Sequence, residues 1–216
     1  MSYSRYHDEV VSLYKSYNKI IKPLIAEIEV RCESFPQAIY NEIRAFNDHI
    51  ARCYNRDFSD DDFVKLELFK AKGHIERIIL DCYKFLNVFL YKYVVEKFDK
   101  RTKNIDLSLI GNGDFYLEYK KGRQFIIKNL KKAKLLETSD KEKSLEYYQQ
   151  VHNEYSFLEE LIEANDSNII WAKTKQNLSI LGKILLWLLS AIISGVISSS
   201  IIPWDKICSW VLEIIF

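Results

Sequence analysis

The chain has 216 residues, enough for one ordinary domain with an appendage, and its 31 basic and 30 acidic residues leave a formal net charge of +1. Its six glycines and three prolines are too few for a β-sandwich, a β-barrel or a disordered linker protein. The abundance of Lys, Glu, Leu, Ile and Tyr favours long helices, so we expect an all-α fold. The mean hydropathy is slightly negative, but this average hides a charged region followed by an apolar one.

The first 54 residues carry apolar side chains at helical spacing. Residues 3–33 predict a helix that Pro23 kinks or restarts. Residues 34–36, Ser-Phe-Pro, predict a break, and a second helix follows over Pro36–Tyr54 because proline suits a first helical turn. One face of this second helix carries the apolar residues Ile39, Ile43, Phe46, Ile50 and Cys53.

Three more helices and one loop are predicted before the apolar region. Ser59 and the three aspartates after it predict the start of a helix that runs from Asp60 to about Lys100. Residues 104–113, with a Gly-Asn-Gly turn, predict a loop. Helices follow over residues 114–136 and 139–165, and the second of them opens with the spacing of a capping box.

The apolar region begins with nineteen residues, Ile184 to Ile202, that include no charged side chain. Nineteen helical residues rise about 28 Å, close to the ~30 Å hydrocarbon core of a bilayer. The segment is apolar around its whole circumference, which argues against the alternative of a buried core helix. We therefore predict a transmembrane helix over about Leu178–Ile202.

This helix divides the chain into three parts. We predict a helical cytosolic domain over residues 1–170, a juxtamembrane and transmembrane helix over 171–202, and a short terminal apolar helix over 203–216 that is interfacial or re-entrant. Lys173 and Lys175 precede the span, so the positive-inside rule places the domain in the cytosol and sends the C-terminus outward.

Small residues form rows along the predicted span. One row holds Ser190, Ser194 and Ser198, and the adjoining row holds Ala191, Gly195 and Ser199. In lipid, such rows let helices pack closely, and serines hydrogen-bond across the contact. The same face is also suited to line a narrow polar pore. Because one helix cannot enclose a channel, the pore interpretation requires a homo-oligomer.

No catalytic set is visible in the sequence. The four histidines are scattered outside any HExxH or cysteine-rich metal pattern, and no phosphate-binding glycine motif is present. We therefore expect neither an enzyme nor a metal site nor a bound cofactor.

A basic run lies in the predicted helix over residues 114–136. It consists of Lys120, Lys121, Arg123, Lys128, Lys131, Lys132 and Lys134, without an acid between them. Aromatic residues are interleaved, so the run suits nucleic-acid phosphates and stacked bases, or anionic lipid headgroups. The alternative is that the acidic stretch over residues 135–166 neutralises the run in an antiparallel helix pair.

A second charged group lies on the predicted helix Pro36–Tyr54. Arg44, Asp48 and Arg52 follow one another at i, i+4 spacing, typical of solvated salt bridges. Such a ladder can also orient Arg44 and Arg52 toward an anionic ligand, and we retain both arginines as candidates.

In order of parts, the chain resembles the small membrane-pore effectors of bacterial anti-phage (abortive-infection) systems, and it is similar in layout to the channel-forming subunits of Hailong systems. The residues that carry the resemblance are the span Ile184–Ile202, its serine row and the basic run. The resemblance implies an oligomeric channel in the bacterial inner membrane that a DNA oligomer or another nucleotide ligand restrains, with a protein regulator as a further partner.

Two functions are therefore expected from the sequence. The first is a ligand-gated, oligomeric membrane protein that conducts ions or permeabilises the membrane. The alternative is a single-pass membrane-anchored scaffold whose helical domain recruits a protein partner. Polar residues along a pore would favour the first, and an apolar exposed groove on the domain would favour the second.

Overall fold

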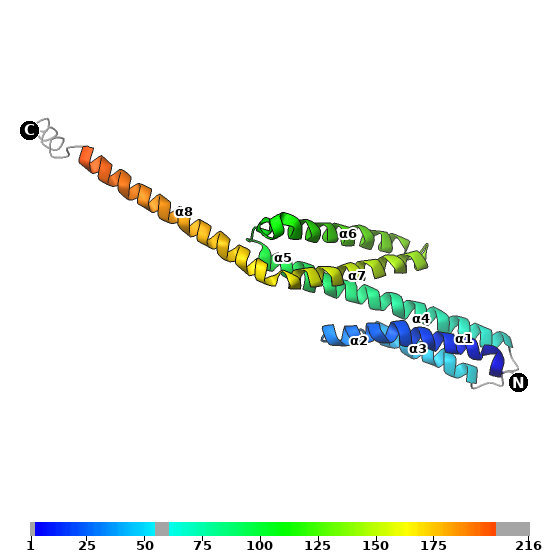
Figure 1. Ribbon diagram of the computed structural model, residues 1–216. Coiled ribbons are helices and arrows are strands. Elements are labelled where there is room, and N and C mark those ends of the chain that lie inside the picture. Colours follow the sequence, from blue (N-terminus) through cyan, green and yellow to red (C-terminus); the bar gives the residue numbers. More distant parts are fainter. Residues whose placement is uncertain (1–2, 55–60, 202–216) are drawn as a thin grey trace, which may run out of the picture. The chain divides into compact units, whose positions relative to one another are not determined.

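The computed structural model describes residues 3–54 and 61–201, and the side chains of residues 6–54 and 61–195. Within these ranges the chain forms helices and no strand, which confirms the all-α prediction (Figure 1). Contacts divide the chain into two compact units, Met1–Lys103 with Tyr116–Ala164, and Asn104–Phe115 with Asn165–Phe216. The sequence predicted one cytosolic domain over residues 1–170. In the structure, residues 104–115 of that range group with the C-terminal helix instead.

The helices of the first unit follow the predicted order closely. The second predicted helix begins at Gln37, one residue after Pro36, whose carbonyl accepts hydrogen bonds from the amides of Ile39 and Tyr40. The predicted starting residues Ser59 and Asp60 lie outside the described residues. The elements are α1 (Tyr3–Ser16), a π-helical turn η1 (Tyr17–Ile21), α2 (Lys22–Arg31), α3 (Gln37–Tyr54), α4 (Asp61–Leu90), a second π-helical turn η2 (Tyr91–Glu96), α5 (Lys97–Thr102), α6 (Asp114–Leu136) and α7 (Lys141–Ala164).

Pro23 neither ends nor visibly breaks the first helical stretch, because a π-helical turn precedes it. Proline has no amide hydrogen, and its ring clashes with the carbonyl four residues earlier in a regular helix. In η1 the hydrogen bonds shift by one residue, and the Lys22 amide donates to the Tyr17 carbonyl. The chain stays helical from Tyr3 to Arg31, as predicted.

The core of the first unit lies between α3 and α4, which run side by side in Figure 1. The predicted apolar face of α3 is confirmed, since Ile39, Phe46, Ile50 and Cys53 are buried and Ile43 packs partly buried against them. α4 contributes a matching row that includes Val64, Leu68, Ala71, Ile75 and Ile78.

Helices α6 and α7 form an antiparallel hairpin in the same unit. The Asp140 carboxylate caps α7 by accepting a hydrogen bond from the Lys143 amide at 3.0 Å. At Gly122 the α6 backbone lies close to α7, because a Cβ there would be 2.7 Å from Leu158 Cδ2. Tyr119 ties α6 to α5, since its hydroxyl donates to the Asp99 carboxylate at 2.8 Å.

The second unit consists of the predicted loop and one long helix, α8 (Asp166–Ile201). In the loop, Gly111, Asn112 and Gly113 all have positive φ angles (54°, 55° and 95°), which explains the two glycines. Gln176 of α8 holds the loop, because its side chain donates to the Asn104 carbonyl at 3.0 Å and accepts from the Asp106 amide at 2.9 Å. The predicted terminal segment, residues 203–216, lies outside the described residues.

Candidate functional site

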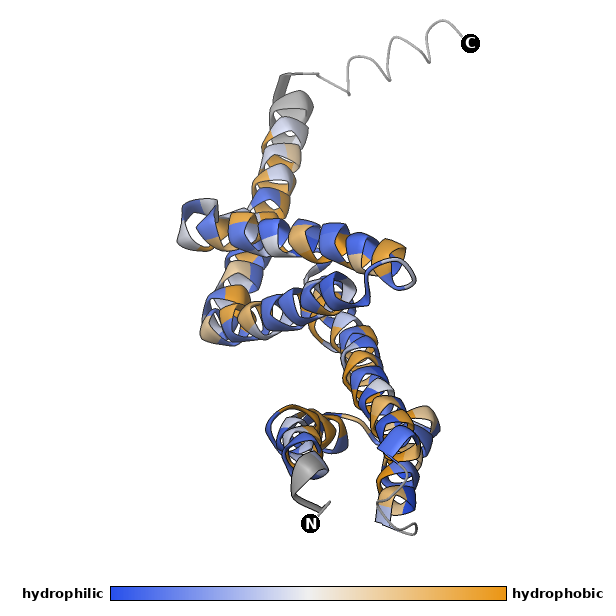
Figure 2. Cartoon of the chain, turned by 90° about the vertical axis from the view of Figure 1, so that its right-hand side faces the viewer, coloured by the Kyte–Doolittle hydropathy of each residue, from blue (hydrophilic) through white to orange (hydrophobic). Residues whose placement is uncertain are grey.

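Helix α8 has the dimensions of a membrane span. Its described part from Asp166 to Gly195 is long and apolar enough to cross a bilayer, and its most apolar stretch has no buried residue. The five consecutive residues from Leu185 to Leu189 are all exposed, so large apolar side chains cover every face of the helix. In Figure 2 the upper part of this helix is orange and pale, whereas blue is frequent in the other helices. A soluble protein rarely exposes such a surface, and α8 therefore fits membrane association.

The predicted small-residue rows lie on this exposed helix. Ser190, Ala191, Ser194 and Gly195 are exposed, and the side chain of Ser198 is outside the described residues. The Ser190 hydroxyl donates to the Trp187 carbonyl at 2.7 Å. This bond satisfies the hydroxyl proton inside the helix and leaves the oxygen free to accept from a neighbouring helix or from water.

The start of α8 carries a pairing suited to a membrane interface. The Lys175 ammonium lies 4.6 Å from the centre of the Trp171 ring, and both residues are exposed. Tryptophan concentrates at the level of the lipid headgroups, and lysine marks the cytosolic end of a span. The pair stands at the end of α8 where the sequence predicts the cytosolic interface.

Four lysines of the basic run lie on one face of α6. Lys120, Lys121, Lys128 and Lys131 are exposed, and at 3.6 residues per turn they occupy an arc of ~100°. Gly122, Ile126, Asn129 and Ala133 occupy the opposite face and are buried. No salt bridge to these four lysines forms within the part of the chain that the structure describes.

The remaining three basic residues of the run have partners inside the protein. Arg123 pairs with Asp99 at 3.0 Å, and Lys134 lies 3.8 Å from Glu137. Lys132 is half-buried, with its ammonium 5.0 Å from the centre of the Tyr147 ring on α7. The structure thus separates the seven residues into four exposed lysines without an ion pair among the described residues and three residues with a partner in the same chain.

The acids around α7 pair elsewhere. Glu159 accepts from Arg31 of α2 at 2.8 Å, and Glu137 accepts from Lys84 of α4 at 2.9 Å. Among the described residues, the acidic stretch forms one salt bridge with the basic run, between Glu137 and Lys134. It does not neutralise the four solvent-facing lysines.

Of the two arginines predicted as a second anion site, Arg44 and Arg52, the structure pairs Arg52 with a residue outside the predicted i, i+4 ladder. The Arg52 guanidinium lies 3.5 Å from the Glu67 carboxylate of α4. Glu67 is buried and also pairs with Lys70 at 2.8 Å and with His49 Nδ1 at 2.7 Å. Arg44 is exposed. Arg52 thus belongs to a charged cluster that joins α3 to α4, and its role as a ligand for an external anion stays a prediction.

The electrostatics of this cluster favour an ionised Glu67. Burial raises the pKa of its carboxyl, but the hydrogen bonds from Lys70 and His49 outweigh burial and lower the pKa from 4.5 to about 2. A neighbouring pair extends the cluster, since Glu42 accepts from Arg77 at 2.9 Å and the rings of His49 and His74 stack at 5.0 Å. Sequence reasoning missed Glu67 because two of its partners, His49 and Arg52, lie on another helix.

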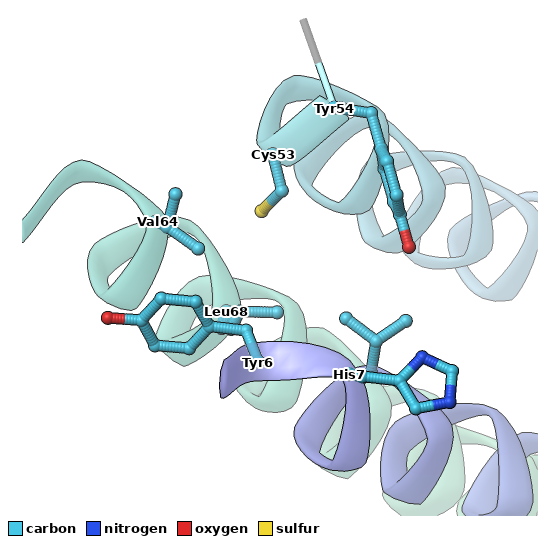
Figure 3. Close-up of a pocket in the computed structure, with 7 residues that line it drawn as sticks. Tyr6, His7, Cys53, Tyr54, Val64 and Leu68 are labelled. Carbon is cyan, nitrogen blue, oxygen red and sulfur yellow. The ribbon is translucent and has the colours of Figure 1, made fainter. Parts of the chain in front are cut away.

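Two hollows occur at the N-terminal end of the first unit. The smaller one, about 10 Å³, lies among Tyr6, Cys53, Val64 and Leu68, with His7 at its edge (Figure 3). A cavity of this size holds one water at most. The larger one is an open groove of about 550 Å³ between α1 and α4, which we call the α1/α4 groove; it is lined by Glu9, Ser12, Leu13, Ser16, Lys65, Leu68, Phe69, Lys72, Ile75, Glu76 and Ile79. Sequence reasoning did not find this groove.

No group of three or more metal-ligating side chains comes together among the described residues. Comparisons with family models, with curated proteins and with solved structures find no match to this chain.

Proposed function

We propose that the chain is an oligomeric membrane protein of the bacterial inner membrane, in which α8 helices from several copies surround a conducting path and the helical body stays in the cytosol. The observation that carries this proposal is the most apolar stretch of α8, which is exposed on all faces and has a row of small polar residues along one of them. An anti-phage effector that permeabilises the membrane is the role that agrees with this arrangement.

The row on α8 supports a pore more than a simple anchor. An anchor requires only apolar length, whereas Ser190 and Ser194 place hydroxyl groups one helical turn apart on one face. In an oligomer that face meets other helices or water, and Ala191 and Gly195 let the backbones approach. Leu188 and Ile192 occupy the opposite side and face lipid.

The ligand that gates the path is, in this proposal, an anion that binds to α6. Lys120, Lys121, Lys128 and Lys131 present four charges without internal partners in the described structure, over about 17 Å of helix. Such a row suits the phosphates of a short nucleic acid, each neutralised by one lysine. Arg44 and Arg52 remain a second candidate site for an anion.

Cysteine accessibility tests the pore. In active protein reconstituted in vesicles, single cysteines at Ser190 and Ser194 react with small charged thiol reagents, and cysteines at Leu188 and Ile192 are protected by lipid. Ser194→Leu blocks ion flux because it narrows and dries the path. Equal protection of all four positions in active protein would refute the pore and leave the membrane assignment intact.

A second candidate function is a single-pass anchor whose body recruits a protein partner. The α1/α4 groove favours it, because its floor is apolar and it is open to solvent. The mass of the protein in detergent separates the two functions. A strict monomer can only be an anchor, whereas a stable oligomer supports the pore.

A further inference from the structure

The rim of the α1/α4 groove carries one large exposed apolar side chain, that of Phe69. Phe69 is 75 % exposed, and Leu66, three residues earlier on α4 and outside the lining of the groove, is 50 % exposed. The groove floor next to them is apolar and includes Leu13, Leu68 and Ile79. An isolated exposed apolar residue is ordinary, but a phenylalanine beside an open apolar groove is typical of a contact surface.

Charged residues of both signs line the groove, and along α4 the basic ones precede the acidic one. Lys65 and Lys72 come first, and Glu76 follows one turn after Lys72. Lys65 lies 3.9 Å from the exposed carboxylate of Asp62, an interaction worth little in water. Glu76 is eleven residues from Lys65, about 16 Å along the helix, so the two cannot pair within one chain.

We propose that the α1/α4 groove is the contact surface for a second copy of this chain, with the two α4 helices antiparallel about a two-fold axis. In the register centred between residues 70 and 71, Lys65 of each copy lies level with Glu76 of the other. The same register sets Phe69 beside Lys72 of the second copy, whose aliphatic stem and groove floor cover the ring.

Charge complementarity selects this occupant and this register. A two-fold contact uses the same patch on both copies. Every contact between two residues therefore occurs twice, once in each direction. Lys65 and Glu76 satisfy this condition, and the contact forms two equivalent ion pairs. A shift of the axis to residue 71 would place Lys65 level with Arg77 and would be repulsive.

The contact deepens the oligomeric part of the proposed function and rests on it, but it makes a separate claim about the body. A two-fold contact joins copies in pairs, because it covers the α1/α4 groove of both chains and leaves neither groove open to a third copy. Assembly beyond the dimer then depends on α8. Loss of the groove contact and loss of ion flux are therefore distinguishable.

Charge exchange combined with site-specific cross-linking tests the contact in the full-length protein in detergent. With a short bismaleimide, Phe69→Cys gives a cross-linked dimer of twice 25.6 kDa. Lys65→Glu or Glu76→Lys added to it lowers the yield about tenfold, because each change makes two repulsive pairs. The double exchange, Lys65→Glu with Glu76→Lys, restores the yield, since the pairs re-form with reversed sign.

The matched control exchanges Glu96 and Lys100, an exposed pair within one chain at 2.7 Å and outside the groove. Reversing either of these charges leaves the cross-linking yield unchanged. A double exchange at residues 65 and 76 that cross-links no better than the single variants would overturn the proposal, and the groove would then belong to a different protein. Protein that cross-links as expected but conducts no ions would refute only the pore.

Discussion

The four solvent-facing lysines of α6 make a quantitative prediction for the binding of a short single-stranded DNA. Each phosphate contact on a single strand contributes about −0.7 to the slope of log K against log salt concentration. Lys120, Lys121, Lys128 and Lys131 have no ion pair among the described residues, so we expect a slope of about −2.8. Lys128→Gln with Lys131→Gln removes two contacts and reduces the slope to about −1.4. Fluorescence anisotropy of a labelled oligonucleotide, titrated at several KCl concentrations with the full-length protein in detergent, measures both slopes.

The control for this prediction is a pair of substitutions in the same basic run. Lys132 packs over the Tyr147 ring and Lys134 lies 3.8 Å from Glu137, so both charges already have partners inside the protein. Lys132→Gln with Lys134→Gln therefore leaves the slope near its original value. A slope that responds equally to both pairs of substitutions would refute the division of the run. Undetectable binding of the unchanged protein at low salt would refute the nucleic-acid site on α6.

Two further predictions concern the stability of the helical body, measured by urea unfolding in detergent with circular dichroism as the readout. The pKa of Glu67 is lowered from 4.5 to about 2 in the folded state, so its stabilising effect is fully present above pH 5 and is lost as the pH falls toward 2. Glu67→Gln also leaves Lys70 without its partner. It therefore lowers the free energy of unfolding by ~3 kcal/mol at pH 7 and has little effect near pH 2. An equal effect at both pH values would contradict this prediction. Gly122→Ala lowers the free energy of unfolding by ~1–3 kcal/mol, because the new Cβ meets the buried Leu158 side chain at 2.7 Å. Gly73→Ala, at a helical position with nothing within 4 Å of the new Cβ, raises it by ~0.5–1 kcal/mol, and the prediction fails if the two variants behave alike.

Much of the fold follows from the sequence, because helix ends and helix faces are local properties. The bounds of α6 agree with the prediction at both ends, and α7 begins at Lys141, with Asp140 as its cap, next to the predicted start at Ser139. The buried face of α3 follows from the spacing of its apolar residues. The span was visible because an uncharged stretch of that length needs no tertiary context to be recognised.

The sequence did not reveal which charged residues face solvent and which pair with another side chain, because this depends on which helix lies opposite. Lys131 and Lys132 are adjacent and chemically identical, yet one faces solvent and the other packs over Tyr147 of α7. Arg52 was expected to pair with Asp48 on its own helix and instead pairs with Glu67 on α4. Contacts between residues far apart in the chain decide these roles.

The sequence by itself determined that this chain is helical and that its C-terminal part is apolar enough to span a membrane, since both depend on the periodicity and length of short segments. Only the tertiary structure decided that four lysines of α6 face solvent and that Glu67 is buried among partners. It alone showed that α1 and α4 leave an apolar groove between them beside Phe69. The physical reason is that burial and pairing energies arise between helices, and their relative positions result from packing the whole core.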